Sequence, residues 1–282
     1  MPDEYHDHKP GEQPTSVLLL PGFTIIDHVT PALTPDLIKY FVNPSVTTTS
    51  PLVPAPLPPP RGEESGSDVS SEVSDKQHED EQRQQLQYLQ QLSPQEIHSL
   101  TPLRSRPCPH SAVILLCSQR TRDVRCGQSA PLLRKEFERH LRPLGLFREL
   151  DDERPGGVGI YFVSHVGGHK YAANVIVYRR RDFNWYRQDT TTTTATATAT
   201  SDDDDDESDT DIDQDQEEKG RSKNTRSNNP VDEGASQGIW LARVRPEDCE
   251  NIIRYTVLQG KVVKPGHQLR GGFDREKGLI SW

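Results

Sequence analysis

The sequence predicts an α/β domain whose elements follow the order strand, helix, strand, strand, strand, helix. Short apolar runs indicate the strands, at residues 113–117, 158–163, 173–178 and 239–244. Apolar residues at helical spacing indicate two helices, which begin near Ser129 and Pro246. This order, a βαβ unit followed by a ββα unit, is the core of the thioredoxin fold.

The βαβ unit has the clearest local signals. Its first strand is a continuous apolar run, as expected of a strand that is buried on both faces. Ser129 is a candidate N-cap for the helix, Pro131 falls near its first turn, and Gly145 ends it. Because strand–helix–strand connections are almost always right-handed crossovers, the two strands of this unit should be parallel.

The ββα unit carries a long acidic insertion. The third and fourth strands can pair as a hairpin, and residues 186–237 at its tip contain Thr/Ala repeats, the acidic run 202–206 and a polar stretch. Such insertions cost least at loop tips, and this composition predicts disorder. Cys249 lies on the apolar stripe of the final helix and should be core, whereas Cys108 between prolines should be an exposed thiol.

We therefore predict three regions. Residues 1–43 contain one apolar run at 16–20 and a helix-like piece at 34–42, which cannot bury a core alone. They either pack onto the main domain or are what remains of a larger N-terminal domain. Residues 44–108 are a Pro/Ser/Gln-rich linker, and 109–282 are the main domain with its insertion.

Composition excludes several classes of protein. Hydrophobic residues make up only 32% of the 282, and the net charge is −10 with no basic cluster, which argues against nucleic acid as a partner. No apolar run reaches the roughly 20 residues that a membrane span needs. Four cysteines without paired spacing do not form a disulfide framework. We expect a soluble protein in a reducing compartment.

Two spaced pairs of metal-type ligands organise the main domain. Cys117 and Cys126 follow the first strand as Cys-x8-Cys, and His165 and His169 follow the second strand as His-x3-His. In the predicted fold, the loop after the first strand and the loop before the third strand lie side by side, so the pairs should meet. Gly127 after Cys126 permits close backbone approach there.

Two thiolates and two imidazoles suit an iron–sulfur cluster or zinc. A thioredoxin-type thiol oxidoreductase is an alternative, although the eight-residue spacing is far from Cys-x-x-Cys. A structural Cys2His2 zinc domain is another, although its usual short cysteine spacing is absent. We assign no catalytic residue, and no pair of carboxylates is placed for glycoside hydrolysis.

These pairs, with the run His165-Val-Gly-Gly-His-Lys-Tyr-Ala-Ala-Asn-Val-Ile-Val-Tyr178, resemble the fungal and plant sucrase/ferredoxin-like family. The resemblance covers about 110–178 and 238–282. It implies a thioredoxin-like ferredoxin whose [2Fe-2S] cluster is held by Cys117 and Cys126 on one iron and by His165 and His169 on the other. Relatives usually carry a full N-terminal thioredoxin-like half, so 1–43 would be a shortened remnant or the product of a truncated gene model.

The resemblance implies an electron carrier rather than an enzyme with its own substrate, working between an unknown reductase and an unknown acceptor. Imidazole ligands raise the reduction potential relative to thiolates, as in Rieske centres, and a solvent-facing ring nitrogen would couple proton to electron uptake. The terminal Ile280-Ser281-Trp282 resembles the signal by which the cytosolic iron–sulfur assembly machinery recognises its clients. We therefore expect a cytoplasmic protein, with mitochondria as the alternative.

Overall fold

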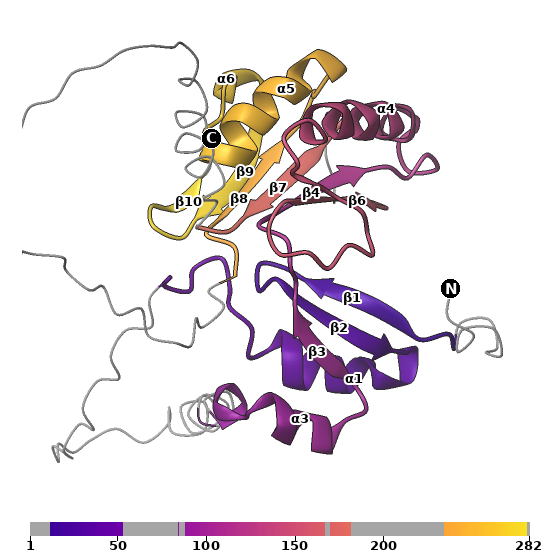
Figure 1. Ribbon diagram of the computed structural model, residues 1–282, viewed down its shortest axis with the longest axis vertical. Helices are drawn as coiled ribbons and strands as arrows, with labels where there is room; N and C mark the ends of the chain where they lie inside the picture. Colours follow the sequence, from indigo (N-terminus) through magenta and orange to yellow (C-terminus); the bar gives the residue numbers. More distant parts are fainter. Residues whose placement is uncertain (1–11, 53–83, 85–87, 167–169, 182–233, 281–282) are drawn as a thin grey trace, which may run out of the picture. The chain divides into compact units, whose positions relative to one another are not determined.

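The computed structural model describes residues 12–52, 84, 88–166, 170–181 and 234–280, which form a three-stranded and a seven-stranded sheet with their helices (Figure 1). The larger sheet has the order β10-β9-β8-β7-β4-β6-β5. Its strands are β4 (Ala112–Cys117), β5 (Phe147–Arg148), β6 (Val158–Val163), β7 (Val175–Arg179), β8 (Gln237–Leu241), β9 (Leu269–Asp274) and β10 (Gly278–Ile280).

Strand β4 is the centre of the larger sheet. It pairs in parallel with β6, so that Cys117 lies opposite Val163, and antiparallel with β7, so that Leu116 lies opposite Val175. Strands β7 and β8 form an antiparallel pair. The predicted βαβ–ββα order and the parallel pairing of its first two strands are thus observed. All residues of β4 except the half-buried Leu115 are buried, as its continuous apolar run predicts.

Helices cover one face of this sheet (Figure 1). Helix α4 (Val124–Leu141) connects β4 to β5 and contacts both β4 and the helical segment that follows β8. That segment consists of η5 (Pro246–Asp248), α5 (Cys249–Asn251) and η6 (Ile252–Val257), and the short α6 (Pro265–Gln268) precedes β9. The predicted core stripe is confirmed, because Cys249, Ile252, Ile253 and Val257 are all buried.

Helix α4 begins five residues before the predicted N-cap. Asp123 is the N-cap instead, and its carboxylate accepts a hydrogen bond from the backbone N–H of Arg125 at 2.9 Å. Ser129 and Pro131 lie inside the helix, where the Ser129 hydroxyl donates to the carbonyl of Arg125 at 2.8 Å. Pro131 is tolerated in the third turn at the loss of one backbone hydrogen bond. The earlier start places Cys126 in the first turn.

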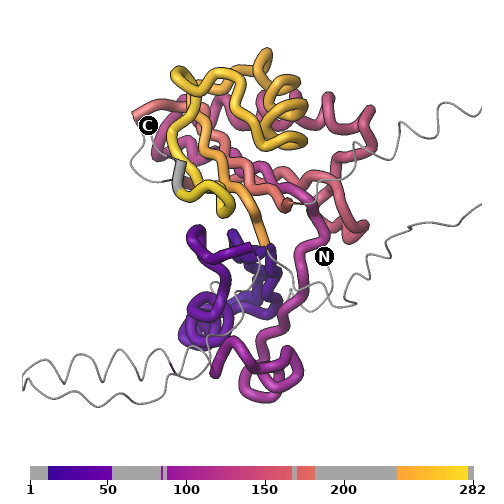
Figure 2. The backbone as a smooth tube through the Cα atoms, turned by 90° about the vertical axis from the view of Figure 1, so that its left-hand side faces the viewer, coloured from indigo at the N-terminus to yellow at the C-terminus, as the bar shows by residue number. Residues whose placement is uncertain are grey.

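The smaller sheet is built from the N-terminus and from residues just before β4. Strands β1 (Thr15–Leu19) and β2 (Thr24–Val29) form a hairpin, and β2 also pairs with β3 (Arg104–Pro107). In Figures 1 and 2 these segments, far apart in the sequence, lie side by side. The helical pieces are η2 (Pro31–Leu33), α1 (Thr34–Leu37), η3 (Ile38–Val42) and α3 (Pro94–Leu100).

This region has its own small core, which a strand and a helix alone would lack. Buried Ile26, Val29, Phe41 and Leu103 form it. The predicted strand at 16–20 and helix at 34–42 are present, but β2 was missed. Helix α3 and β3 lie within the range 44–108 that the sequence assigned to a linker.

The signal for α3 was readable in the sequence. Ser93 and Glu96 form a capping box, in which the Glu96 side chain accepts the Ser93 backbone N–H at 2.7 Å. The linker residues 53–83 and most of the predicted insertion, 182–233, lie outside the described residues, as do Ser281 and Trp282 of the predicted terminal signal. The described residues resume at Gly234, and Ala235 and Ser236 are already buried.

The expectation that Cys108 is exposed was wrong. Its side chain is 2% exposed and packs in a cluster with Phe23, Val113, Ala235 and Phe273. The Cys108 N–H donates to the carbonyl of Phe23 at 2.7 Å. The flanking prolines predict a loop, whereas the thiol is buried by side chains from three segments that are distant from one another in the sequence, namely the N-terminal hairpin, β4 and the β8–β9 region.

Candidate functional site

Cys117 and Cys126, nine positions apart in the sequence, meet at the end of β4. Cys117 is the last residue of β4 and is 3% exposed, and Cys126 in the first turn of α4 is fully buried. The two side chains hydrogen-bond to one another, and burial raises the pKa of the Cys117 thiol to about 11. The turn from strand to helix thus brings together the two sulfurs that the sequence singled out.

A tight turn between the cysteines makes this approach possible. A Cβ atom on Gly127 would lie 2.6 Å from Cβ and 2.7 Å from Cα of Arg120, so only glycine fits beside this backbone. Asp123 caps the helix and accepts hydrogen bonds from the backbone N–H groups of Arg125 and Cys126. The expected role of Gly127 in close backbone approach is therefore confirmed.

Hydrogen-bond donors reach both sulfurs from the segment between β6 and β7. The backbone N–H of Val166 donates to the Cys117 sulfur, and Nδ2 of Asn174 lies 3.9 Å from Sγ of Cys126. The Cys117 N–H in turn donates to the carbonyl of Asn174 at 3.1 Å. N–H groups directed at sulfur favour its negatively charged form, which is the form that binds metals.

Asn174 holds this corner of the fold together, and sequence reasoning missed it. It is 1% exposed, its Nδ2 donates to the carbonyl of Tyr171 at 2.7 Å, and its Oδ1 accepts the indole N–H of Trp240 at 3.1 Å. Both sides of the amide are thus satisfied by groups on different segments. A polar residue directly before the apolar run of β7 was the available signal, since buried strand starts rarely hold an amide without such partners.

The two histidines are the less complete half of the candidate site. His165 lies just after β6, is exposed, and precedes Val166, whose N–H contacts Cys117. His169 lies outside the described residues. Within the described part of the chain, no group of three or more His, Cys, Asp or Glu side chains is close enough to hold a metal ion. The four-ligand set of Cys117, Cys126, His165 and His169 stays a prediction.

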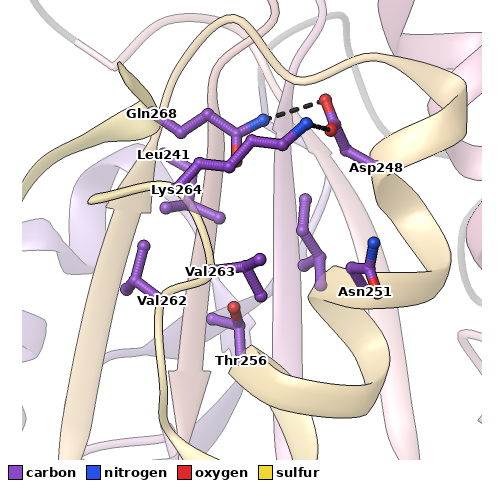
Figure 3. A pocket seen from close by; sticks show the side chains of 9 residues that line it. Leu241, Asp248, Asn251, Thr256, Val262, Val263, Lys264 and Gln268 are labelled. Atoms are coloured by element: carbon purple, nitrogen blue, oxygen red, sulfur yellow. Dashed lines mark hydrogen bonds and ion pairs between the residues drawn. The ribbon is translucent and has the colours of Figure 1, made fainter. Parts of the chain in front are cut away.

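A small cavity beside α5 and η6 is a separate, structural feature (Figure 3). Its polar wall is the buried carboxylate of Asp248, which accepts hydrogen bonds from Nζ of Lys264 at 2.7 Å and Nε2 of Gln268 at 2.9 Å. The backbone N–H of Arg245 donates to the same carboxylate at 2.9 Å. These donors outweigh the effect of burial and lower the pKa of Asp248. None of the four predicted ligands lines this cavity.

No helix in the described ranges is long and apolar enough to cross a membrane. No solved structure matches the chain. Among curated proteins, the chain is similar to "Actin patches distal protein 1" of Saccharomyces cerevisiae, with 54% identity over 69 residues, 24% of this chain and 22% of that protein. It is also similar to "Altered inheritance of mitochondria protein 32" of Debaryomyces hansenii, with 39% identity over 152 residues, 54% of this chain and 33% of that protein.

The counterpart with the same name in Kluyveromyces lactis is 36% identical over 159 residues, 56% of this chain and 31% of that protein. The chain thus spans between about a fifth and a third of the length of these curated relatives. The family model described as sucrase/ferredoxin-like matches residues 2–271, which is nearly the whole sequence. The chain belongs to the sucrase/ferredoxin-like family.

Proposed function

We propose that this protein is an electron carrier that binds a [2Fe-2S] cluster through Cys117, Cys126, His165 and His169. The observation that carries the proposal is the meeting of the two cysteine sulfurs at the end of β4, with N–H donors directed at both. This donor set suits a cluster whose cysteine-bound half is buried and negatively charged. Membership of the sucrase/ferredoxin-like family supports the same function.

Each residue has a distinct part. Cys117 and Cys126 would bind as thiolates, and the Val166 N–H and the Asn174 amide would stabilise their charge. The start of α4, where Cys126 lies, adds the partial positive charge of a helix N-terminus. His165 would bind as a neutral imidazole on the exposed side of the site. When bound, the cluster supplies reversible one-electron transfer.

We further propose that the domain is thioredoxin-like. The strand order β6-β4-β7-β8, with β6 parallel and β7 antiparallel to β4, supports this, as does α4 between the two parallel strands. Strands β9 and β10 then extend the sheet beyond this core. The exposure of His165 also supports coupled proton uptake, because solvent can reach this side of the site.

The test begins with protein purified without oxygen. We expect a red-brown protein with about two iron and two sulfide per chain and a reduced-state EPR signal, as the cluster type requires. Replacing His165 or His169 with Cys should change the visible absorption spectrum and the EPR spectrum, and should lower the reduction potential. The matched control is His140→Cys near the C-terminal end of α4, which should change neither spectrum. A potential independent of pH across the neutral to alkaline range would refute the proton coupling.

A thiol oxidoreductase is the second candidate, because the contact between Cys117 and Cys126 would also permit a disulfide. Against it, the eight-residue spacing is far from Cys-x-x-Cys, and both thiols are buried, Cys117 at 3% exposure and Cys126 fully. A colourless, metal-free protein that forms a Cys117–Cys126 disulfide on oxidation would favour this candidate. A colourless protein with one zinc would instead indicate a structural zinc domain.

We propose a cytoplasmic location, with mitochondria as the alternative. The alternative is supported by the relatives from Debaryomyces hansenii and Kluyveromyces lactis, whose names refer to inheritance of mitochondria. The proposed partners of the protein are a reductase that supplies electrons and an acceptor that takes them. Recognition by the cytosolic iron–sulfur assembly machinery would use Ile280-Ser281-Trp282. Deleting these three residues should lower the cluster content of the protein made in cells, and should leave cluster uptake by chemical reconstitution unchanged.

A further inference from the structure

A group of cations surrounds Tyr171, which lies two residues after the predicted ligand His169, in the segment that leads into β7. The guanidinium carbon of Arg243 lies 3.7 Å from the centroid of the Tyr171 ring, and that of Arg270 lies 4.2 Å from it. The Lys170 ammonium lies 5.7 Å from the same centroid. We call Tyr171 and these three side chains the cationic patch.

The patch is a built feature rather than a set of loose side chains. The carbonyl of His267 accepts hydrogen bonds from Nη1 of Arg243 at 3.3 Å and from Nη2 of Arg270 at 3.2 Å. Arg243 has a left-handed backbone with φ of 56°, and its N–H donates to the carbonyl of Ala172 at 3.0 Å. Three separate segments therefore fix the two guanidinium groups against one ring.

The charge of the patch is not neutralised within the described part of the chain. Neither Arg243, Arg270 nor Lys170 has an ion pair with a described carboxylate. Other arginines do, namely Arg106, Arg125, Arg134, Arg139, Arg142, Arg154, Arg181 and Arg245. The chain as a whole has a net charge of −10, so this patch is a local region of positive charge on a negatively charged protein. It can attract an external anionic surface.

The patch is connected to the candidate cluster site through Asn174. The carbonyl of Tyr171 accepts a hydrogen bond from Nδ2 of Asn174 at 2.7 Å, and the same nitrogen lies 3.9 Å from Sγ of Cys126. Two hydrogen bonds thus separate the backbone of the patch from a predicted cluster ligand. A partner that docks on the patch would stand close to the redox centre.

We infer that the cationic patch is the docking surface for a carboxylate-rich face of the protein that exchanges electrons with this chain. The inference rests on the proposed function and adds the chemistry of the partner. Arginine recognises planar carboxylates through paired hydrogen bonds, and its weakly hydrated guanidinium suits a protein interface. An acidic partner would be steered to this surface by long-range attraction, which salt weakens.

The first experiment uses the cluster-loaded full chain and two small oxidants of opposite charge. Reduced protein gives one electron to hexacyanoferrate(III), forming hexacyanoferrate(II), or to hexaammineruthenium(III), forming hexaammineruthenium(II), and the oxidised cluster remains. In stopped-flow mixing at low salt, R243Q/R270Q should slow the anionic oxidant by about fivefold and should accelerate the cationic one. The control R139Q/R142Q, with the same change in net charge at the C-terminal end of α4, should change both rates by less than about twofold.

The second experiment works without a cluster and so separates the two proposals. The probe is a fluorescein-labelled decaglutamate peptide, whose binding is followed by fluorescence anisotropy at low and high salt. We expect R243Q/R270Q to weaken binding by about tenfold and R139Q/R142Q to weaken it much less. Lys170→Gln, which changes an exposed side chain, is the second variant should the double arginine variant unfold. Equal binding by all variants would overturn the docking surface, whereas a protein without a cluster would overturn only the proposed function.

Discussion

Replacing Asn174 with leucine is the most informative single change in this fold. The side chain is 1% exposed and makes three polar contacts, with the carbonyl of Tyr171, the indole N–H of Trp240 and Sγ of Cys126. Leucine has the same branching and the same number of side-chain heavy atoms, but it can make none of these contacts. The substitution therefore tests the polar network with a side chain of similar shape.

The magnitude follows from the groups that lose their partners. Leaving a buried donor or acceptor unsatisfied costs about 1–3 kcal/mol. Asn174→Leu leaves two such groups without this partner, the carbonyl of Tyr171 and the indole N–H of Trp240. The indole is half-buried, so water can replace part of its lost hydrogen bond. We expect the free energy of unfolding to fall by about 3 kcal/mol, which lowers the melting temperature of a domain of this size by about 6–12 °C.

The assay is urea and thermal unfolding followed by far-UV circular dichroism. The matched control is Asn251→Leu on the exposed surface of α5, which should change the unfolding free energy by less than about 0.5 kcal/mol. In cluster-loaded protein, Asn174→Leu should also lower the reduction potential. The amide N–H of Asn174 stabilises the more negative, reduced state, and the variant loses this donor. An unfolding free energy equal to that of the wild type would refute the network argument.

Three further predictions concern stability. Burial lowers the pKa of the His110 imidazole from 6.5 to about 4, so the unfolded chain binds a proton at this residue more readily than the folded protein. The free energy of unfolding should therefore fall by up to about 3 kcal/mol as pH drops from 6.5 to 4. Urea unfolding of the wild type and of His110→Phe should show this fall in the difference between the two proteins. Gly127→Ala should lower the unfolding free energy by about 1–3 kcal/mol and weaken cluster binding, while Gly266→Ala, with open space around it, should do neither. Asp248→Ala should cost about 2–3 kcal/mol at neutral pH because it leaves the buried Gln268 amide unpaired, and the difference should narrow as pH falls below 3.8 and through the lowered pKa of the native carboxylate.

Elements with strong local patterns were predictable from the sequence. The apolar run of β4 and the stripe of Cys249, Ile252, Ile253 and Val257 specify buried faces without reference to any partner. The start of α4 was misplaced because Ser129 and Pro131 imitate a helix N-terminus, while the true cap, Asp123, lies between arginines in a polar loop. Strands β9 and β10 were missed because glycines interrupt their pattern, and pairing with β8 is what orders them.

The candidate site divides in the same way. The Cys117–Cys126 contact followed from the order of elements, since a strand and the helix after it place their adjoining ends together. Asn174 and the pairing of Arg243 and Arg270 around one ring depend on segments that are about 70 to 100 residues apart, and no local pattern specifies such contacts.

The register of the central strands explains how the domain can carry a long acidic insertion without disturbing the cysteine pair. Val175 at the start of β7 lies opposite Leu116, beside Cys117, whereas Arg179 at its end lies opposite Ala112 at the other end of β4. The insertion therefore leaves the sheet one strand length from the cysteines, about 16 Å for five residues. At that far end Arg179 donates to the side chain of Gln237 at 2.7 Å and so links the last residue of β7 to the first of β8. Because β7 and β8 are linked at this end, the length of the chain between them does not affect the geometry of the cysteine pair.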